Sequence, residues 1–320
     1  MKLGLAFLIA IHAAVFLAPW LSPYDYAEQH RDFPFAPPIR IHIFDAKGSA
    51  HRPFVYAVTE DAGSGMYREQ PRVIYPVRVF AGGRLFGVDS PAALFLLGSD
   101  GFGRDVLSRL LYGARISLLT GLIAALLSAG VGLMLGTLAG YFRGWPDQVL
   151  MRGGELMMAL PWLYLLLAVR ALLPQHVSTL HTFILMIAII GGIGWVRPAR
   201  LIRAVVLSAR ESDFVLAARG FGASHWYLLR RHILPFTTGV VVTQATILIP
   251  QYILAEVSLS FLGLGVGEPV PSWGNMLSEG MQYHALVSHP WLLVPGFATV
   301  AVLLAYLKVA DALADRTVTH

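Results

Sequence analysis

Charged residues are scarce in this sequence, where Asp, Glu, Lys and Arg together make up only 13% of 320 residues. Soluble domains carry about 25% charged residues, so the chain has roughly half the charge of a soluble fold. Hydrophobic residues reach 56%, and the mean hydropathy is +0.62. This depletion excludes an ordinary soluble domain and indicates a membrane protein.

Cysteine is absent, which excludes disulfides, thiol catalysis and cysteine-ligated metals. The 11 histidines include no His-x-x-x-His pair, so no metal site is predicted. The only lysines are Lys2, Lys47 and Lys308, and none follows glycine in a Walker loop. No Gly-x-Ser-x-Gly nucleophile motif is present. We therefore expect no catalytic residue, no cofactor and no nucleotide site, and predict that the chain is not an enzyme.

A net charge of +5 is a common sign of nucleic-acid binding, but here the 24 Lys and Arg residues mostly flank apolar runs. Orientation of a chain in a lipid bilayer explains that arrangement better than a phosphate-binding stripe does. We therefore expect membrane lipid, and no nucleic acid, as the surroundings of this chain.

Six apolar stretches approach the roughly 20 residues that a membrane helix needs. They cover residues 3–21, 116–142, 156–173, 182–196, 235–259 and 290–307. The first resembles a secretory signal, but it is long and ends without a clean small-x-small cleavage site, which favours an uncleaved anchor. Pro161 predicts a kink in the third stretch, and glycines that weaken the fourth are tolerated at close helix contacts.

The basic residues predict an orientation. Seven arginines lie between 197 and 231, and Arg143 and Arg152 flank another short loop. The positive-inside rule places both segments in the cytoplasm, which puts both termini inside and residues 22–115 outside. The outer segment is also basic, but long translocated domains are largely exempt from the rule.

The outer segment has features of its own. Alternating residues and two β-rich runs around Gly82-Gly83 predict a small β-rich extracytoplasmic insert over residues 22–97, with a hairpin at the two glycines. Within residues 98–115, Val106, Leu107 and Leu110 share one face, which predicts a helix lying in the membrane interface. The alternative is a soluble amphipathic helix of the insert.

A helix–glycine–helix pattern follows the fourth stretch. Asp213 is a suitable N-cap for a helix through Arg219, and Gly222 can end that helix in a left-handed conformation. Ser224 can cap a second short helix, and Pro235 opens the fifth stretch, where its missing N–H does little harm. The pattern predicts a rigid elbow between two membrane helices, within a cytoplasmic loop over residues 197–234.

Ala217-Ala218-x-x-x-Gly222, followed by Leu234-Pro235, resembles the "EAA" loop of ABC importer permeases. Leu216 stands where that pattern has Glu and His232 where it has Ile. Both departures are typical of the dipeptide/oligopeptide/nickel branch. Three further segments in order, at residues 97–118, 258–265 and 271–276, are similar to motifs of its C-type (DppC/OppC-like) subunits.

The resemblance implies an all-α multi-spanning permease with about six transmembrane helices in a bacterial or archaeal cytoplasmic (inner) membrane. It implies a first anchor over residues 1–21, a permease core over 116–314 and a cytoplasmic tail over 315–320. The implied partners are a homologous B-type permease, two cytoplasmic ATPases, an extracytoplasmic binding protein and a peptide substrate. The elbow would dock in an ATPase groove, with its contact residues Asp213, Ala217, Ala218, Arg219, Gly222, Ser224, Leu234 and Pro235.

Several alternatives stay open at this point. Nickel chelates, glutathione and peptide antibiotics are handled in the same branch. A secondary transporter is disfavoured because no internal repeat is visible. Glu256, near the outer end of the fifth stretch, either lines the pathway or pairs with Arg170, and we favour the structural pairing.

Overall fold

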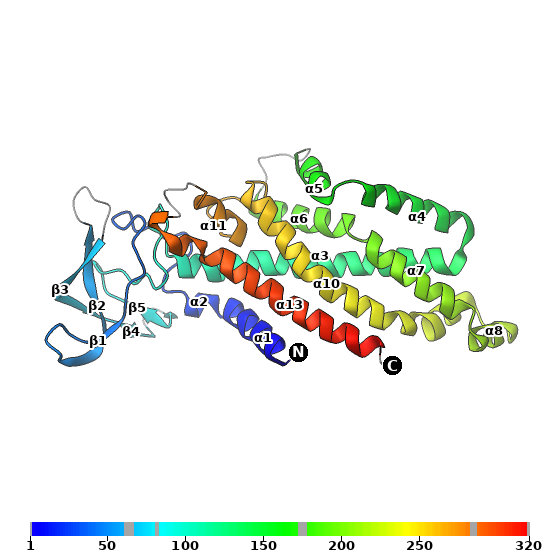
Figure 1. Cartoon of the computed structure of the whole chain (residues 1–320), viewed down its shortest axis with the longest axis horizontal. Coiled ribbons are helices and arrows are strands. Elements are labelled where there is room, and N and C mark those ends of the chain that lie inside the picture. The colour runs from blue at the N-terminus through cyan, green and yellow to red at the C-terminus, as the bar shows by residue number, and fades with distance from the viewer. Residues whose placement is uncertain (1, 61–66, 81–82, 172–177, 282–286, 319–320) are drawn as a thin grey trace. The chain divides into compact units, whose positions relative to one another are not determined.

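The structure, a computed structural model, describes residues 2–60, 67–80, 83–171, 178–281 and 287–318. The chain divides into two compact units. One comprises Met1–Ala6, Leu118–Leu259 and Ala301–His320, and the other comprises Phe7–Ser117 and Ser260–Val300. The first unit is helical in its described residues, and the second adds small β-sheets to its helices (Figure 1).

Three continuous helical stretches in the described residues are long and apolar enough to cross a bilayer. They are Val106–Phe142, His225–Phe261 and Pro290–Leu313. The first is α3, and the other two contain most of α10 (Leu234–Phe261) and α13 (Val294–Val318). A fourth crossing is formed if α6 (Thr179–Ile193) and α7 (Val196–Arg210), which meet at a 42° bend, count as one span.

The remaining apolar runs form shorter helices. Residues 3–21 contain α1 (Lys2–Phe16) and α2 (Ala18–Leu21). Residues 156–173 contain the end of α4 (Gly144–Ala159) and α5 (Trp162–Ala171). The kink predicted at Pro161 is a full break, because Leu160 leaves the helical region with ψ 136°. Proline sterically disfavours helical backbone in the residue before it.

Residues 98–115, expected to contain an interfacial helix that leads into the second span, do not form a helix of their own. Residues from Val106 onward form the first turns of α3, which continues without interruption to Phe142. No proline lies within α3 to interrupt it. Gly113 allows a close approach of the Ser272 backbone to this helix, because a Cβ on Gly113 would lie only 3.3 Å from it. Arg104 and Arg109, which lie beside the predicted apolar face in the sequence, are buried with carboxylates.

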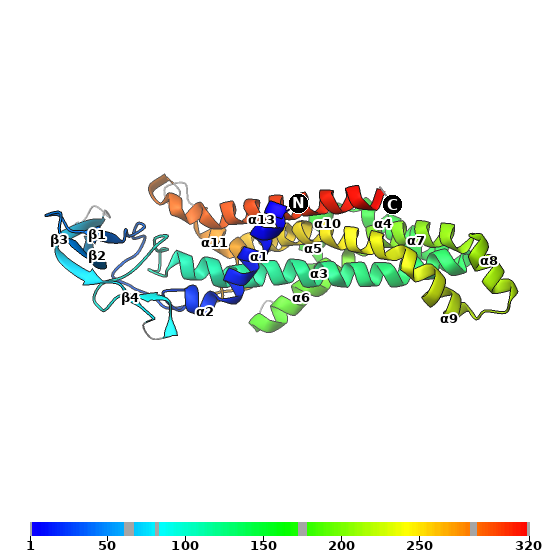
Figure 2. The same ribbon diagram turned by 90° about the horizontal axis from the view of Figure 1, so that it is seen from below.

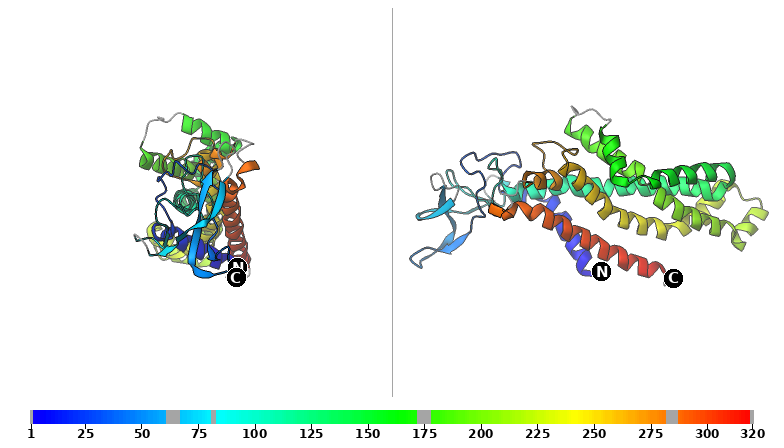
Figure 3. Two further views of the ribbon diagram at one scale, coloured as in Figure 1. Left: turned by 90° about the vertical axis from the view of Figure 1, so that its left-hand side faces the viewer. Right: turned by 45° about the horizontal axis from the view of Figure 1, so that its top comes forward.

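In the first unit, α3 and α7 approach closely along a stripe of glycines. A Cβ on Gly136 would lie 2.4 Å from the carbonyl oxygen of Ala199, and one on Gly132 would lie 2.9 Å from Pro198. This spacing of small residues, four apart, is a common way to bring membrane helices together. On another side α7 lies beside α4 (Figure 3), and Arg203 donates to Asp147 at 2.6 Å between them.

In the second unit, the strands form two sheets. β1 (His42–Phe44), β2 (Ala50–Glu60) and β3 (Tyr67–Pro76) form an antiparallel sheet in that order. β4 (Arg78–Val79) pairs antiparallel with β5 (Phe86–Gly87), on either side of the two glycines of the expected hairpin. A hydrophobic core packs beside the larger sheet and consists of Ala36, Ile39, Val55, Ala93, Leu94 and Phe95.

Candidate functional site

The elbow, defined here as residues 211–233, connects α7 to α10. It contains α8 (Asp213–Gly220), α9 (His225–Leu228) and a π-helical turn, η2 (Leu229–Ile233). Figure 2 shows α8 and α9 as successive short helices beyond the end of α7. The helix–glycine–helix order is the one that the sequence predicts.

The start of α8 differs from the prediction by one residue. Ser212 is the N-cap, with extended backbone at φ −70° and ψ 145°, and Asp213 is the first helical residue. The assignment of Asp213 as N-cap is therefore wrong. Ser and Asp are both competent caps, so residue preference does not decide between neighbours. Asp213 still places a negative charge at the positive end of the helix dipole.

The end of α8 is a Schellman motif. Gly222 has φ +83°, and its N–H bonds to the carbonyl of Arg219 at 3.0 Å. The N–H of Ala223 bonds to the carbonyl of Ala218 at 3.1 Å. The left-handed conformation predicted for Gly222 is confirmed, and it turns the chain sharply between α8 and α9.

The second helix of the elbow continues into the membrane span. The hydroxyl of Ser224 accepts from the N–H of Tyr227 at 3.3 Å, which confirms Ser224 as the N-cap. From there the helical stretch runs without a break to Phe261. The expected boundary at Leu234-Pro235 is therefore absent. The π-turn ends two residues before Pro235. Proline lacks the N–H that a regular α-helix would use there, and the π-turn is the local change in hydrogen bonding next to it.

A small core supports the elbow from beneath. Its buried residues come from α3, α7 and the elbow, and they are Tyr141, Ile202, Val206, Ala209, Val215, Leu228 and Ile233. The hydroxyl of Tyr141 also lies 2.7 Å from Nδ1 of His225. The elbow is thus packed onto the helices that carry it, and a force applied to it acts on those helices.

The two alanines of the motif have different surroundings. Ala217 is exposed, whereas Ala218 is half-buried and packs against the supporting core. Ala218 therefore does not share the outward position of Ala217, because Val215, one turn before it, directs that side inward, and its contact with an ATPase stays a prediction. Arg219 is exposed beside Ala217.

Several large apolar side chains of the elbow are exposed. Phe221 is 92% exposed and Trp226 is 68% exposed, on either side of the Gly222 turn. Phe214, Leu216 and Tyr227 are also exposed. Exposed large apolar side chains gathered on one element are one sign of an interaction surface. We call these five residues, four of which are aromatic, the aromatic face of the elbow.

A second functional candidate is an ionic cluster in the other unit, formed by Asp100, Arg104, Arg109, Glu268 and Glu279. Arg104 pairs with Asp100 at 2.6 Å, Glu268 at 2.5 Å and Glu279 at 2.7 Å. Arg109 pairs with Glu268 at 2.9 Å and Glu279 at 3.1 Å, and it is fully buried. The cluster ties the chain just before and within the start of α3 to the segment after α10 and to the end of α11 (Trp273–Glu279).

The charges in the cluster do not balance, because three carboxyl groups face two guanidinium groups. Burial raises the pKa of Glu279 to about 7, despite the opposing charges of Arg109 and Arg104. For Glu268, burial acts in the same direction, but the two arginines outweigh it and lower its pKa. Glu279 is therefore the carboxyl that takes up a proton first.

Sequence reasoning treated Asp100, Arg104 and Arg109 only as part of a family motif and did not single out Glu268 or Glu279. Glu268 and Glu279 lie about 160 residues or more from their partners, at separations of 164 and 175 residues from Arg104. The cluster could have been anticipated from the charged residues at 100–109, which lie beside an apolar run. Charges in such a place need opposite charges from elsewhere in the chain.

Glu256, the intramembrane acid singled out in the sequence, is completely buried in α10. Its proposed partner Arg170 belongs to α5, but the side chain of Arg170 lies outside the described part of the structure. The pairing between them stays a prediction.

Comparison with known proteins agrees with these motifs. The profile of the family described as "Binding-protein-dependent transport system inner membrane component" matches residues 132–319. A second profile, "N-terminal TM domain of oligopeptide transport permease C", matches residues 2–38. Among solved structures, the MetNI methionine ABC transporter gives a TM-score of 0.45 at 18% identity, over 64% of this chain and 95% of that one.

Curated relatives cover more of the chain. A di/tripeptide transport system permease protein DppC from Pseudomonas aeruginosa is 34% identical over 98% of this chain and 85% of its own length. A dipeptide transport system permease protein DppC from Bacillus subtilis is 37% identical over 70% and 68% of the two chains. A glutathione transport system permease protein GsiD from Pectobacterium atrosepticum is 35% identical over 71% and 73%. This chain belongs to the binding-protein-dependent transport system inner membrane components, as a DppC/OppC-like ABC permease.

Proposed function

We propose that this chain is the C-type permease subunit of an ATP-driven peptide importer in the bacterial or archaeal inner membrane. It forms the translocation pathway with a homologous B-type permease. Two cytoplasmic ATPases and an extracytoplasmic binding protein complete the assembly. Relatives that match most of the chain carry dipeptide and di/tripeptide transport names, which supports peptides as the substrate class.

The observation that carries this proposal is the elbow. Its aromatic face is exposed, while its core is packed onto α3 and α7 and its second helix continues into α10. A docking surface joined rigidly to membrane helices can transmit the closure of an ATPase to the pathway. The contact residues proposed for it are Asp213, Ala217, Arg219, Gly222 and Ser224, with Leu234 and Pro235 at the base and Ala218 in a supporting role.

The proposed topology has six spans, with both termini in the cytoplasm. The spans are α1 with α2, α3, α4 with α5, α6 with α7, α10 and α13. The two sheets would then lie on the extracytoplasmic side with the ionic cluster, and the elbow would face the ATPases. A reporter fused near Gly63 should be active only if it works outside, and one fused after His320 only if it works inside.

The direct test is purification of the chain from its native host, followed by reconstitution in vesicles. A second permease and ATPase subunits should copurify, and the assembly should accumulate peptides only when ATP and loaded binding protein are supplied. Ala217→Arg should remove the ATPase subunits, whereas the matched variant Ala217→Ser should keep them. Recovery of a transport-active homo-oligomer without an ATPase would refute the proposal.

A further inference from the structure

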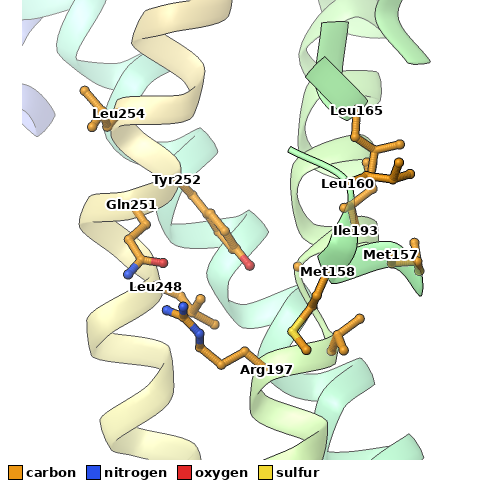
Figure 4. Close-up of a pocket in the computed structure, with 12 residues that line it drawn as sticks. Met157, Met158, Leu160, Leu165, Ile193, Arg197, Leu248, Gln251, Tyr252 and Leu254 are labelled. Atoms are coloured by element: carbon orange, nitrogen blue, oxygen red, sulfur yellow. The ribbon is translucent and has the colours of Figure 1, made fainter. Parts of the chain in front are cut away.

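The first unit contains a cavity of about 500 Å³ beside the middle of α10 (Figure 4). Ligand pockets commonly measure about 300–1,000 Å³ and combine apolar walls with a few polar groups. Most of this wall is leucine, methionine, isoleucine and valine, and the polar side chains are Arg197, Gln251 and Tyr252. The cavity therefore has the size and the composition of a binding site.

Three helix irregularities meet at this cavity. Leu160, which lines it, separates α4 from α5. Gly194, which also lines it, lies at the bend between α6 and α7. Pro250 interrupts the ladder of α10 directly before Gln251. In membrane proteins, broken helices persist where the freed backbone lines a cavity, and substrate sites are often built from them.

The cavity is level with the middle of the apolar helices. Gln251 and Tyr252 lie in the central half of α10. Tyr252 also bonds to Ser128, near the centre of the apolar run 116–142 of α3, at 2.9 Å between the hydroxyl oxygens. Pro198, next to Arg197, packs on Gly132 of the same run. Arg197, expected from the sequence at the start of the cytoplasmic loop over residues 197–234, therefore lies in the first turn of α7 beside this apolar run, where an ionic group is costly and is usually functional.

The three polar side chains of the cavity differ in whether they are exposed to a ligand. Tyr252 is buried and fixed by Ser128, and it reaches past Gly194, where an added Cβ would lie 1.7 Å from its hydroxyl oxygen. Arg197 is exposed to the cavity, and within the described residues no carboxylate lies within the 4.0 Å of an ion pair with it. Gln251 is also exposed. Figure 4 shows the Arg197 guanidinium turned toward α10, beside Gln251.

We propose that this cavity is a subsite of the translocation pathway, in which Arg197 binds the terminal carboxylate of a passing peptide and Gln251 bonds to its backbone amide. The inference rests on the proposed peptide import. A guanidinium offers a fork of donors that matches a carboxylate, and Arg197 is also in the first turn of α7, where the helix dipole favours an anion. The apolar wall tolerates varied side chains, as a peptide importer requires.

The absence of cysteine makes a precise test possible. Met158→Cys places the only thiol of this chain in the cavity wall, and its modification is followed in the purified, nucleotide-free complex. A negatively charged methanethiosulfonate should react faster than a positively charged one, because Arg197 attracts anions. Alanine di-, tri- and tetrapeptides with free carboxylates should protect the thiol at concentrations about tenfold or more below those of their C-terminal amides.

Arg197→Gln in the Met158→Cys background should abolish both the preference for the anionic reagent and the preference for the free carboxylate. Arg200→Gln is the matched control, because it removes one charge from the same helix one turn away, outside this cavity, and should preserve both preferences. Arg197→Lys should retain the reagent preference. Equal protection by acids and amides in the Met158→Cys variant that retains Arg197, or retention of the preference after Arg197→Gln, would overturn the inference.

Uptake by the otherwise native complex separates this inference from the proposed function. If the reconstituted complex accumulates the alanine peptides but the acids and amides protect equally, only the subsite is wrong. If no peptide is accumulated with ATP and loaded binding protein, peptide import itself is wrong, and the subsite falls with it.

Discussion

The elbow and the ionic cluster stabilise their parts of the chain in opposite ways. The elbow is held by local devices, namely a Schellman motif and a serine cap, and it exposes Phe221 and Trp226. The ionic cluster is held by partners up to 175 residues apart and buries its arginines. Local hydrogen bonds fix a shape while leaving a surface open for a partner. Buried ion pairs fix a contact whose cost is high if either charge is removed.

The largest effect is expected for Arg109→Met, which tests whether the ionic cluster holds its region together. This change removes a buried guanidinium and leaves the mostly buried Glu279 and the half-exposed Glu268 without one of their cations. Removing one partner of a buried ion pair costs about 3–5 kcal/mol, so the melting temperature of the purified complex should fall markedly. Adding Glu279→Gln, which removes the surplus carboxyl, should recover part of the loss. An unchanged melting temperature in Arg109→Met would show that the cluster does not hold this region together.

The two neighbouring alanines of α8 allow a comparison, within the elbow, between a supporting residue and an exposed one. Ala218→Arg should destabilise the complex by about 1–3 kcal/mol, because the new side chain overpacks the supporting core. Ala217→Arg should leave the melting temperature nearly unchanged, because Ala217 is exposed, yet it should lose stimulated ATP hydrolysis. Thermal melts and ATP turnover on the same preparations separate the two effects. Equal melting temperatures for the two variants would contradict the inward position of Ala218.

Gly222→Val tests the turn alone. Within this chain no atom lies within 4 Å of a Cβ added at Gly222, so the change acts on the fold through its backbone at φ +83°. A non-glycine residue in that region costs roughly 1–2 kcal/mol, and valine is particularly poor there. We expect reduced coupling, measured as ATP turnover stimulated by loaded binding protein. Gly222→Asn should retain more of it, since asparagine tolerates the left-handed region. Identical losses in both variants would argue against strain as the cause.

The smallest expected effect is a pH dependence from Glu279. Its folded-state pKa is raised from 4.5 to about 7, so folding favours its protonated form. The resulting stability is fully present below about pH 4.5 and is lost as the pH rises through about 7. The melting temperature of Glu279→Gln, measured from pH 5 to pH 8, should therefore vary less than that of the unsubstituted protein. Asp105, whose pKa burial raises to about 6, adds a similar trend to both proteins. Parallel pH profiles would exclude Glu279 as the titrating group.

The same contrast explains what could be predicted from the sequence. The turn at Gly222 and the cap at Ser224 follow from the chemistry of a few adjacent residues, and both are present in the structure. The N-cap of α8 was placed one residue late because Ser212 and Asp213 are both suitable. Local rules identify a device of this kind well and place its boundary less well.

Features that depend on distant residues were missed or mistaken. The apolar face of Val106, Leu107 and Leu110 suggested a helix at the membrane interface, because the sequence does not show the neutralisation of Arg104 and Arg109 beyond what Asp100 supplies. Glu268 and Glu279 supply that neutralisation from the other end of the sequence. The cavity was equally inaccessible, since Leu160, Gly194 and Gln251 belong to three separate helical segments. A single sequence contains no signal that brings such segments together.

The π-turn at Leu229–Ile233 sets the rotation of α10 relative to the elbow. A π-turn holds one residue more than an α-helical turn, so everything beyond it is rotated by about 100° relative to an uninterrupted helix. The angle between Trp226 on the elbow and Gln251 at the cavity is therefore set by one extra residue. Deleting a single residue there would leave both surfaces intact but point them in different directions. The residues that form the docking surface and the direction in which that surface faces can thus change independently in this chain.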